Sequence, residues 1–139
     1  MENNNNRISR ETLYMEVAKL MTGRSTCLRK AVGCVLVRDN RIVATSYNGV
    51  PSGVEHCKTC LGPGCDIVIH AEAGLISYCA KHGISTEGTT MYVTLSPCES
   101  CANLIINAGI KKVVYLEKYR LSGGIAKLIC NDVEVEQYE

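Results

Sequence analysis

The residues best suited to chemistry in this chain are two cysteines and one histidine. Cys98 and Cys101 lie in the stretch SPCESC, and His70 lies in the stretch IHAEAGL. Thiolate and imidazole groups are ligands that zinc prefers, and the Cys-x-x-Cys spacing lets both sulfurs reach one ion from the first turn of a helix. The unpaired N–H groups at a helix N-terminus also lower thiol pKa values. Three protein ligands leave the fourth position of a tetrahedral ion for water, which is typical of a catalytic zinc site.

Glu72 follows His70 closely enough to share that site. In the body of a helix, side chains two residues apart diverge by roughly 200°, but at the first turn a histidine and a glutamate can flank one water molecule. Zinc lowers the pKa of such a water from about 15.7 to roughly 7. A carboxylate beside it can accept a proton and deliver it to a substrate. The sequence therefore predicts His70 as a metal ligand and Glu72 as the proton carrier.

A redox role or a purely structural zinc ion fits the cysteine pair less well. A thioredoxin-like redox pair uses the same Cys-x-x-Cys spacing, but this chain has no tryptophan beside its cysteines. A zinc ion with a purely structural role would not need Glu72. His-x-Glu followed by Pro-Cys-x-x-Cys is the signature of zinc-dependent deaminases, and this chain has both parts of it.

The elements that must position these side chains alternate between helix and strand, as the period of the apolar residues indicates. Helices are expected at 12–21, capped by Ser9, and at 70–81, 98–108 and 123–130, and strands at 31–37, 41–47, 89–95, 111–117 and 133–136. The first two strands form a hairpin, and the later alternation implies parallel strands. This order predicts an α/β fold, a three-layer α/β/α arrangement with a central mixed five-stranded sheet. The helices that begin near 70 and 98 should then converge at one edge of the sheet.

Apolar residues at helical spacing support two of these helices. They are Leu13, Val17, Leu20 and Met21 in the first helix and Leu104, Ile105 and Ala108 in the third. Three cysteines that lie in strand or helix patterns, Cys34, Cys79 and Cys130, are expected to be small core residues.

Length and composition limit the remaining possibilities. The 139 residues suit one domain, 1–139, in which the asparagine-rich residues 1–8 are expected to fray. The net charge of +1 provides no basic field for a nucleic acid or a membrane surface, and no apolar run is long enough to span a bilayer. An odd count of nine cysteines without a signal peptide predicts a reducing, cytoplasmic location.

Beyond the zinc signature, the chain resembles the deoxycytidylate (dCMP) deaminases of the cytidine deaminase-like superfamily. The resemblance covers more than half of the chain, and the YNG-x-P-x-G loop separates this family from cytidine and tRNA adenosine deaminases. The matching blocks are RSTCLRKAVGCVLV at 24–37, SYNGVPSG at 46–53, IHAE at 69–72, GTTMYVTLSPCESCANLIINAGIKKVVY at 88–115 and EKY at 117–119.

The resemblance implies zinc-dependent hydrolytic deamination of dCMP to dUMP and ammonia, which supplies a precursor of thymidylate. It assigns zinc to His70, Cys98 and Cys101 and proton transfer to Glu72. In the same way it assigns contact with the sugar to Asn48, contact with the 5′-phosphate to Arg24, Ser25 and Tyr119, and further substrate contacts to Ala71 and Ser96.

The family resemblance also implies regulation, assembly and a second metal. Related enzymes are homohexamers activated by dCTP and inhibited by dTTP, with an effector loop that corresponds here to Tyr47, Asn48, Gly49, Pro51 and Gly53. A second, structural zinc ion would be held by Cys27, Cys57, Cys60 and Cys65, with His56 as an alternative to one thiol. Such a closed site would order the glycine-rich loop between 48 and 65.

One departure from the family pattern leaves the substrate open. The family usually has Asn where this chain has Gly74 in HAEAG. The alternatives are a deaminase of another cytosine compound, such as dCTP or cytidine, and a zinc-stabilised nucleotide-binding regulator without catalysis. Arg24 argues against a nucleoside, and the presence of Glu72 argues against the regulator.

Overall fold

The computed structural model of the protein describes residues 6–55 and 68–139. Helices and strands alternate in the predicted order, and a short 3-10 helix follows the first helix. The helices are α1 (Arg10–Met21), η1 (Thr22–Arg24), α2 (Ala71–His82), α3 (Glu99–Asn107) and α4 (Gly123–Cys130). The strands are β1 (Gly33–Arg38), β2 (Arg41–Tyr47), β3 (Thr90–Leu95), β4 (Lys112–Glu117) and β5 (Glu134–Gln137).

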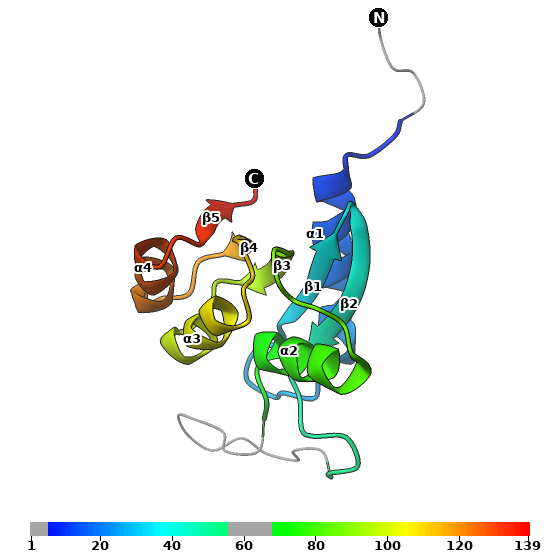
Figure 1. Ribbon diagram of the computed structural model, residues 1–139. Helices are drawn as coiled ribbons and strands as arrows, with labels where there is room; N and C mark the ends of the chain where they lie inside the picture. Colours follow the sequence, from blue (N-terminus) through cyan, green and yellow to red (C-terminus); the bar gives the residue numbers. More distant parts are fainter. Residues whose placement is uncertain (1–5, 56–67) are drawn as a thin grey trace, which may run out of the picture.

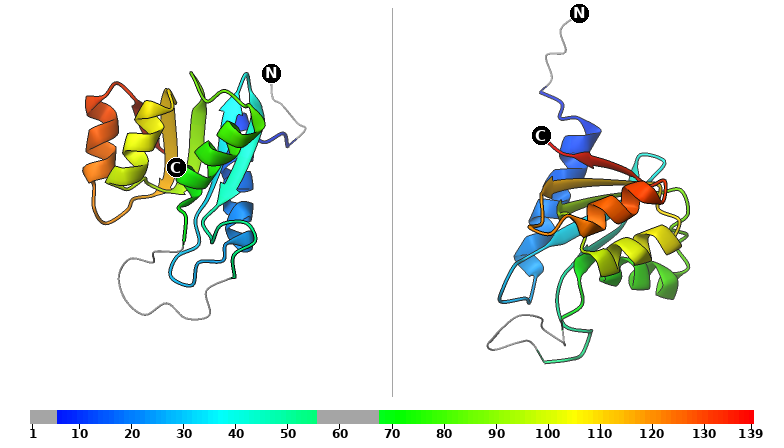
Figure 2. Two further views of the ribbon diagram at one scale, coloured as in Figure 1. Left: turned by 60° about the horizontal axis from the view of Figure 1, so that its bottom comes forward. Right: turned by 90° about the vertical axis from the view of Figure 1, so that its left-hand side faces the viewer.

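The strands form one mixed sheet in the order β2-β1-β3-β4-β5. Strand β1 is antiparallel to both of its neighbours, β2 and β3, whereas β3, β4 and β5 are parallel. Helix α1 covers one face of the sheet, and α2, α3 and α4 cover the other (Figures 1 and 2). This confirms the predicted three-layer α/β/α fold with a mixed five-stranded sheet.

Alternation along β1 divides the core between the two faces, because successive side chains of a strand point to opposite sides. Cys34 and Leu36 pack with α2, α3 and α4, and Val35 and Val37 pack with α1. The β1–β2 hairpin closes through Asp39 and Asn40, which have φ of 50° and 63°. Asp and Asn tolerate this left-handed conformation better than other non-glycine residues, and it matches the twist of a two-residue hairpin.

The apolar residues at helical spacing in α1 do not all face the sheet. Leu13 and Leu20 are 43% and 76% exposed, and the buried residues of the helix are instead Tyr14, Met15 and Ala18. The small Ala18 lets the helix backbone approach β1 so closely that a side chain at Gly33 would strike the Ala18 carbonyl oxygen. The helix therefore presents its small residue to the sheet and leaves its leucines outside.

Helix α3 also leaves an apolar residue exposed, and the core prediction for Cys130 is wrong. Leu104 on α3 is 42% exposed, while Cys101, Ala102 and Ile105 form the buried face of that helix. Cys130, at the end of α4, is exposed, whereas Cys34 and Cys79 are buried as predicted. No helix in the described part of the chain combines the length and apolarity needed to cross a membrane.

Helix α4 supports the segment that leads into α3. At Gly124 an added Cβ would collide with the carbonyl oxygen of Pro97 and come within 2.9 Å of the carbonyl group of Cys98. At neighbouring Gly123, a Cβ would meet only the side chain of Glu99, 2.9 Å from its Cδ atom. Glycine at 124 therefore permits backbone contact between α4 and the start of α3.

We predict that Gly124→Ala lowers the free energy of unfolding by about 1–3 kcal/mol, because the backbone of residues 97 and 98 must move to make room. Gly123→Ala is the matched control: its methyl group displaces only a flexible side chain, so stability should be unchanged or higher. Urea unfolding of both variants measures the difference. If both substitutions changed the free energy of unfolding equally, Gly124 would not be needed for close backbone contact between α4 and residues 97 and 98.

Candidate metal centre

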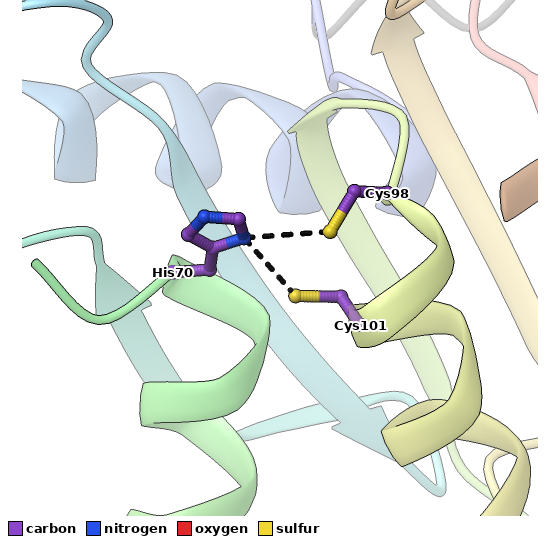
Figure 3. A group of neighbouring side chains, drawn as sticks. All are labelled: His70, Cys98 and Cys101. Atoms are coloured by element: carbon purple, nitrogen blue, oxygen red, sulfur yellow. Dashed lines mark hydrogen bonds between the residues drawn. The ribbon is translucent and has the colours of Figure 1, made fainter. Parts of the chain in front are cut away.

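The ends of two helices bring His70, Cys98 and Cys101 together. His70 and Cys98 are the N-cap residues of α2 and α3, each with extended backbone, and Cys101 lies in the first turn of α3. Neither N-cap side chain bonds to its own helix, so both are available to a shared ligand. Figure 3 shows the imidazole of His70 facing the two sulfur atoms across the gap between the helices.

The spacing of the three side chains fits a tetrahedral zinc ion. The Nδ1 atom of His70 lies 3.5 Å from Sγ of Cys98 and 3.3 Å from Sγ of Cys101. Zinc–sulfur and zinc–nitrogen bonds of ordinary length at a tetrahedral angle would separate S and N by about 3.6 Å. All three ligand atoms lie within 4.8 Å of one another. The donor set, two thiols and an imidazole, is also one that zinc prefers.

The electrostatics of the centre favour a thiolate. Hydrogen bonds from Cys101 and His70 lower the pKa of Cys98 to about 3. The pKa of Cys101 is raised well above its usual range, first by its bond to Cys98 and then by burial. Of the two thiols, Cys98 is therefore the one that more readily carries a negative charge. The bond to Cys98 also raises the pKa of His70.

Glu72 lies beside this centre in the first turn of α2. Its side chain is only 4% exposed, and burial raises the pKa of its carboxyl group to about 7. A group with a pKa near neutrality can both accept and donate a proton, as general acid–base catalysis requires. Burial in this position therefore suits Glu72 to proton transfer.

A cleft of about 470 Å³ opens onto the centre, a volume within the usual range for small-molecule sites. His70, Glu72 and Cys98 line it, together with four residues that the family resemblance assigns to substrate: Asn48, Ala71, Ser96 and Tyr119. Three cations that sequence reasoning missed also line the cleft: Arg29, Lys30 and Arg120.

Asn48 anchors the loop that carries two of these cations. Its buried side chain donates to the carbonyl oxygen of Lys30 at 2.6 Å and accepts from the N–H of Val32 at 2.9 Å. The hydroxyl of Ser25 lies 2.5 Å from its Oδ1 atom. Asn48 thus fixes the path of residues 25–32 along one side of the cleft.

Ser96 has a similar role on the opposite side. Its buried hydroxyl accepts a hydrogen bond from the backbone N–H of Tyr119 at 2.7 Å, and its own N–H donates to the carbonyl oxygen of Glu117 at 2.9 Å. These bonds hold the segment after β4, which carries Tyr119 and Arg120, against the end of β3.

Arg24, Ser25 and Gly74 lie away from the cleft lining. Arg24 is exposed at the end of η1, and the hydroxyl of Ser25 bonds to Asn48. Gly74 faces β2, where an added Cβ would lie 3.0 Å from the hydroxyl of Ser46, so this departure from the family pattern does not border the described cleft. His56, Cys57, Cys60 and Cys65 lie outside the described residues, and Cys27 is half-buried in the cleft lining.

Sheet topology explains how the three cations were missed. Strand β1 runs antiparallel to β3, so the segment before β1 lies beside the segments that follow β3 and β4. Arg29 and Lys30 therefore meet Arg120 across the cleft. The only signal in the sequence is position: Arg29 and Lys30 come shortly before β1, and Arg120 comes shortly after β4. This position predicts a shared cleft only once β1 and β3 are known to be neighbours.

The fold and the site define an α/β protein with a His-Cys-Cys metal centre and a buried carboxyl group at the end of one cleft. The sequence profile of the cytidine and deoxycytidylate deaminase zinc-binding region matches residues 8–117. The chain belongs to this family of zinc-binding deaminases.

Individual relatives show how far the similarity extends. The chain is 44% identical over 118 residues to the ComE operon protein 2 of Bacillus subtilis (strain 168), a match that covers 82% of this chain and 62% of that protein. It is 38% identical over 117 residues to the deoxycytidylate deaminase of Mycobacterium phage D29, over 73% of this chain and 90% of that one. This chain thus spans less than two thirds of the Bacillus protein but most of the phage enzyme.

A solved structure agrees with these matches. The dCMP deaminase of cyanophage S-TIM5, crystallised with dCMP and dUMP, superposes with a TM-score of 0.88 at 36% sequence identity. The superposition covers 95% of this chain and all of the phage chain, 100%. The similarity therefore includes the whole arrangement of sheet and helices.

We predict that Cys101→Ala removes one zinc ion per chain, because the site loses a ligand that is nearly inaccessible to water. Metal analysis by mass spectrometry on the purified protein measures this directly. Cys130→Ala, at an exposed cysteine on α4, should keep the zinc content of the parent. Full zinc occupancy in the Cys101 variant would show that the metal binds elsewhere.

Proposed function

We propose that the protein is a zinc-dependent hydrolase that converts dCMP to dUMP and ammonia, and so supplies a thymidylate precursor. The observation that carries this proposal is the buried carboxyl group of Glu72 beside the His70–Cys98–Cys101 group in a cleft of suitable volume. Relatives named deoxycytidylate deaminase, and a solved one with dCMP and dUMP bound, support this choice of substrate.

The residues of the cleft divide the reaction between them. His70, Cys98 and Cys101 would hold zinc, which when bound supplies a Lewis acid that makes water nucleophilic near neutral pH. Water adds across the double bond between N3 and C4 of cytosine, and the bond between C4 and the amino nitrogen then breaks. Glu72 would take one proton from the attacking water and pass it to N3. It would then take the second proton from the hydroxyl group formed on C4 and pass it to the departing nitrogen, so that ammonia leaves and C4 keeps its carbonyl oxygen.

We predict that Glu72→Gln lowers ammonia release from dCMP by about 10²–10⁴-fold, because the amide cannot shuttle protons. Its zinc content should remain that of the parent, since the three ligands are untouched. Glu99→Gln is the control: Glu99 also lies in the first turn of a helix that begins at the centre, α3, but is exposed. Unchanged turnover in the Glu72 variant would exclude this mechanism.

The cations at the cleft support a phosphorylated substrate over a free nucleoside. Arg29 and Arg120 enter the lining from opposite sides, and Tyr119 lies next to Arg120. Guanidinium groups bind phosphate oxygens with paired hydrogen bonds. We therefore assign the 5′-phosphate to Arg29, Arg120 and Tyr119. The assignment to Arg24 and Ser25, made from the resemblance, remains an alternative that the same experiment tests.

We predict that Arg29→Ala and Arg120→Ala each raise KM for dCMP about tenfold or more, as expected when a charged hydrogen bond is lost. Turnover of cytidine, which has no phosphate, should change little. Arg24→Ala, measured alongside, decides between the two assignments, and it should leave both activities near those of the parent. Equal losses for dCMP and cytidine would show that these arginines do not bind phosphate.

The contacts of the YNG loop support a regulatory role for the family's effector loop. Gly49 pairs with Ile69 through two backbone hydrogen bonds of 3.1 and 2.7 Å, and Ile69 directly precedes His70. A nucleotide bound against 47–53 would therefore press on the segment that carries a metal ligand. The same proposal includes control by dCTP and dTTP in a homohexamer. It also includes a second zinc ion held by Cys27, Cys57, Cys60 and Cys65.

A further inference from the structure

One ion pair connects the two sides of the cleft. Lys30, in the loop before β1, and Glu117, the last residue of β4, are joined by a 2.9 Å contact between Nζ and Oε2. Lys30 lines the cleft, whereas Glu117 lies outside its lining. The carboxylate thus approaches the ammonium group from outside the cleft and neutralises its charge.

Both partners of this pair are held in place by their backbones. Asn48 accepts from Val32 and donates to the carbonyl oxygen of Lys30, and Ser96 donates to the carbonyl oxygen of Glu117. The side chains themselves are about half exposed, 55% and 56%. The backbones of the two residues are therefore fixed, but the attraction between their side chains is weak, because exposed ion pairs contribute little to stability and are screened by salt.

The ion pair changes the effective charge of the cleft. Within the described part of the chain, Arg29 and Arg120 have no ion-pair partner, and Lys30 has one. Counting the described residues alone, the cleft therefore presents two guanidinium groups without an ion-pair partner and one paired ammonium group. Two cations match a monophosphate, which carries a charge of about −2 above pH 7. A triphosphate carries more negative charge and would gain from a third cation.

We propose that Glu117 is a specificity-determining residue that favours nucleoside monophosphates over triphosphates by neutralising Lys30. The inference deepens the proposed function, since it requires that a cytosine nucleotide occupy this cleft. A triphosphate must either compete with Glu117 for Lys30 or leave its outer phosphoryl groups beside a neutralised cation and a carboxylate. A monophosphate bound by Arg29 and Arg120 neither competes with Glu117 for Lys30 nor places further phosphoryl groups beside the carboxylate.

The test is the affinity of the zinc-loaded parent and of zinc-loaded Glu117→Gln for dUMP and dUTP, measured by calorimetry in buffer without added divalent metal. These uracil nucleotides are not deaminated, so binding is read at equilibrium. We expect the substitution to improve the affinity for dUTP relative to dUMP by about threefold, the scale of an exposed ion pair. The gain should shrink as salt is added.

Two further variants separate this effect from a change in overall charge. Glu16→Gln breaks the exposed Lys19–Glu16 pair on α1 and removes the same charge away from the cleft, so it should leave the dUTP to dUMP ratio unchanged. In the double variant Lys30→Gln/Glu117→Gln, the gain for dUTP should disappear. A ratio that is unchanged in Glu117→Gln, or that shifts equally in the double variant, would overturn the inference.

Deamination of dCMP by the parent is measured in the same series and reports on the proposed function alone. In one outcome the parent releases ammonia from dCMP, but Glu117→Gln binds both nucleotides as the parent does. This result would support the proposed function and show that Glu117 does not determine specificity. A parent that binds neither dUMP nor dUTP would contradict both proposals.

Discussion

The structure depends on the convergence of two helix N-termini within bonding distance of one ion. His70 ends the loop before α2, and Cys98 ends the turn after β3, so each ligand is the residue at which a helix begins. At such a position the side chain projects beyond the helix, while Cys101 adds a sulfur one turn later. The 3.3 and 3.5 Å separations between Nδ1 and the sulfurs leave little tolerance. A shift of about 1 Å in either helix end would therefore change the distances between the three side chains at the metal site.

Much of the surrounding architecture serves to keep those ends in place. Gly124 brings α4 against the carbonyl groups of Pro97 and Cys98. Gly49 pairs with Ile69 on the other side, one residue before His70. Asn48 and Ser96 then fix the loops that border the cleft. The cleft is therefore built from loops at one edge of the sheet, each tied to a strand or helix end by a small number of hydrogen bonds.

Local patterns in the sequence were sufficient to predict the fold and to identify the three side chains that the structure brings together at the candidate metal centre, because both depend on short segments. The strand 41–47 and the helix 123–130 were predicted with the bounds that the structure has. The His-x-Glu and Cys-x-x-Cys spacings identified the group at the metal centre before any geometry was known. The inner face of α1 was not predictable from period alone, since the close approach at Gly33 and not the size of Leu20 decides which side is buried.

The cations that line the cleft were harder to predict because their proximity depends on pairing between distant segments. Arg29, Lys30 and Arg120 share one cleft only because β1 lies antiparallel to β3, and no local pattern marks that pairing. The resemblance to a family directed attention to Arg24 instead, which is exposed at the end of η1. Motifs thus point to the candidate metal centre, whereas the cations that line the cleft are located only by the fold.

The central claim is that one zinc ion, held by an imidazole and two thiols, makes this cleft a deaminase. The most direct measurement is ammonia release from dCMP by protein stripped of metal with a chelator, before and after zinc is restored. We expect activity to fall to background on stripping and to return with zinc. Full activity in protein shown by metal analysis to contain no zinc would contradict this claim.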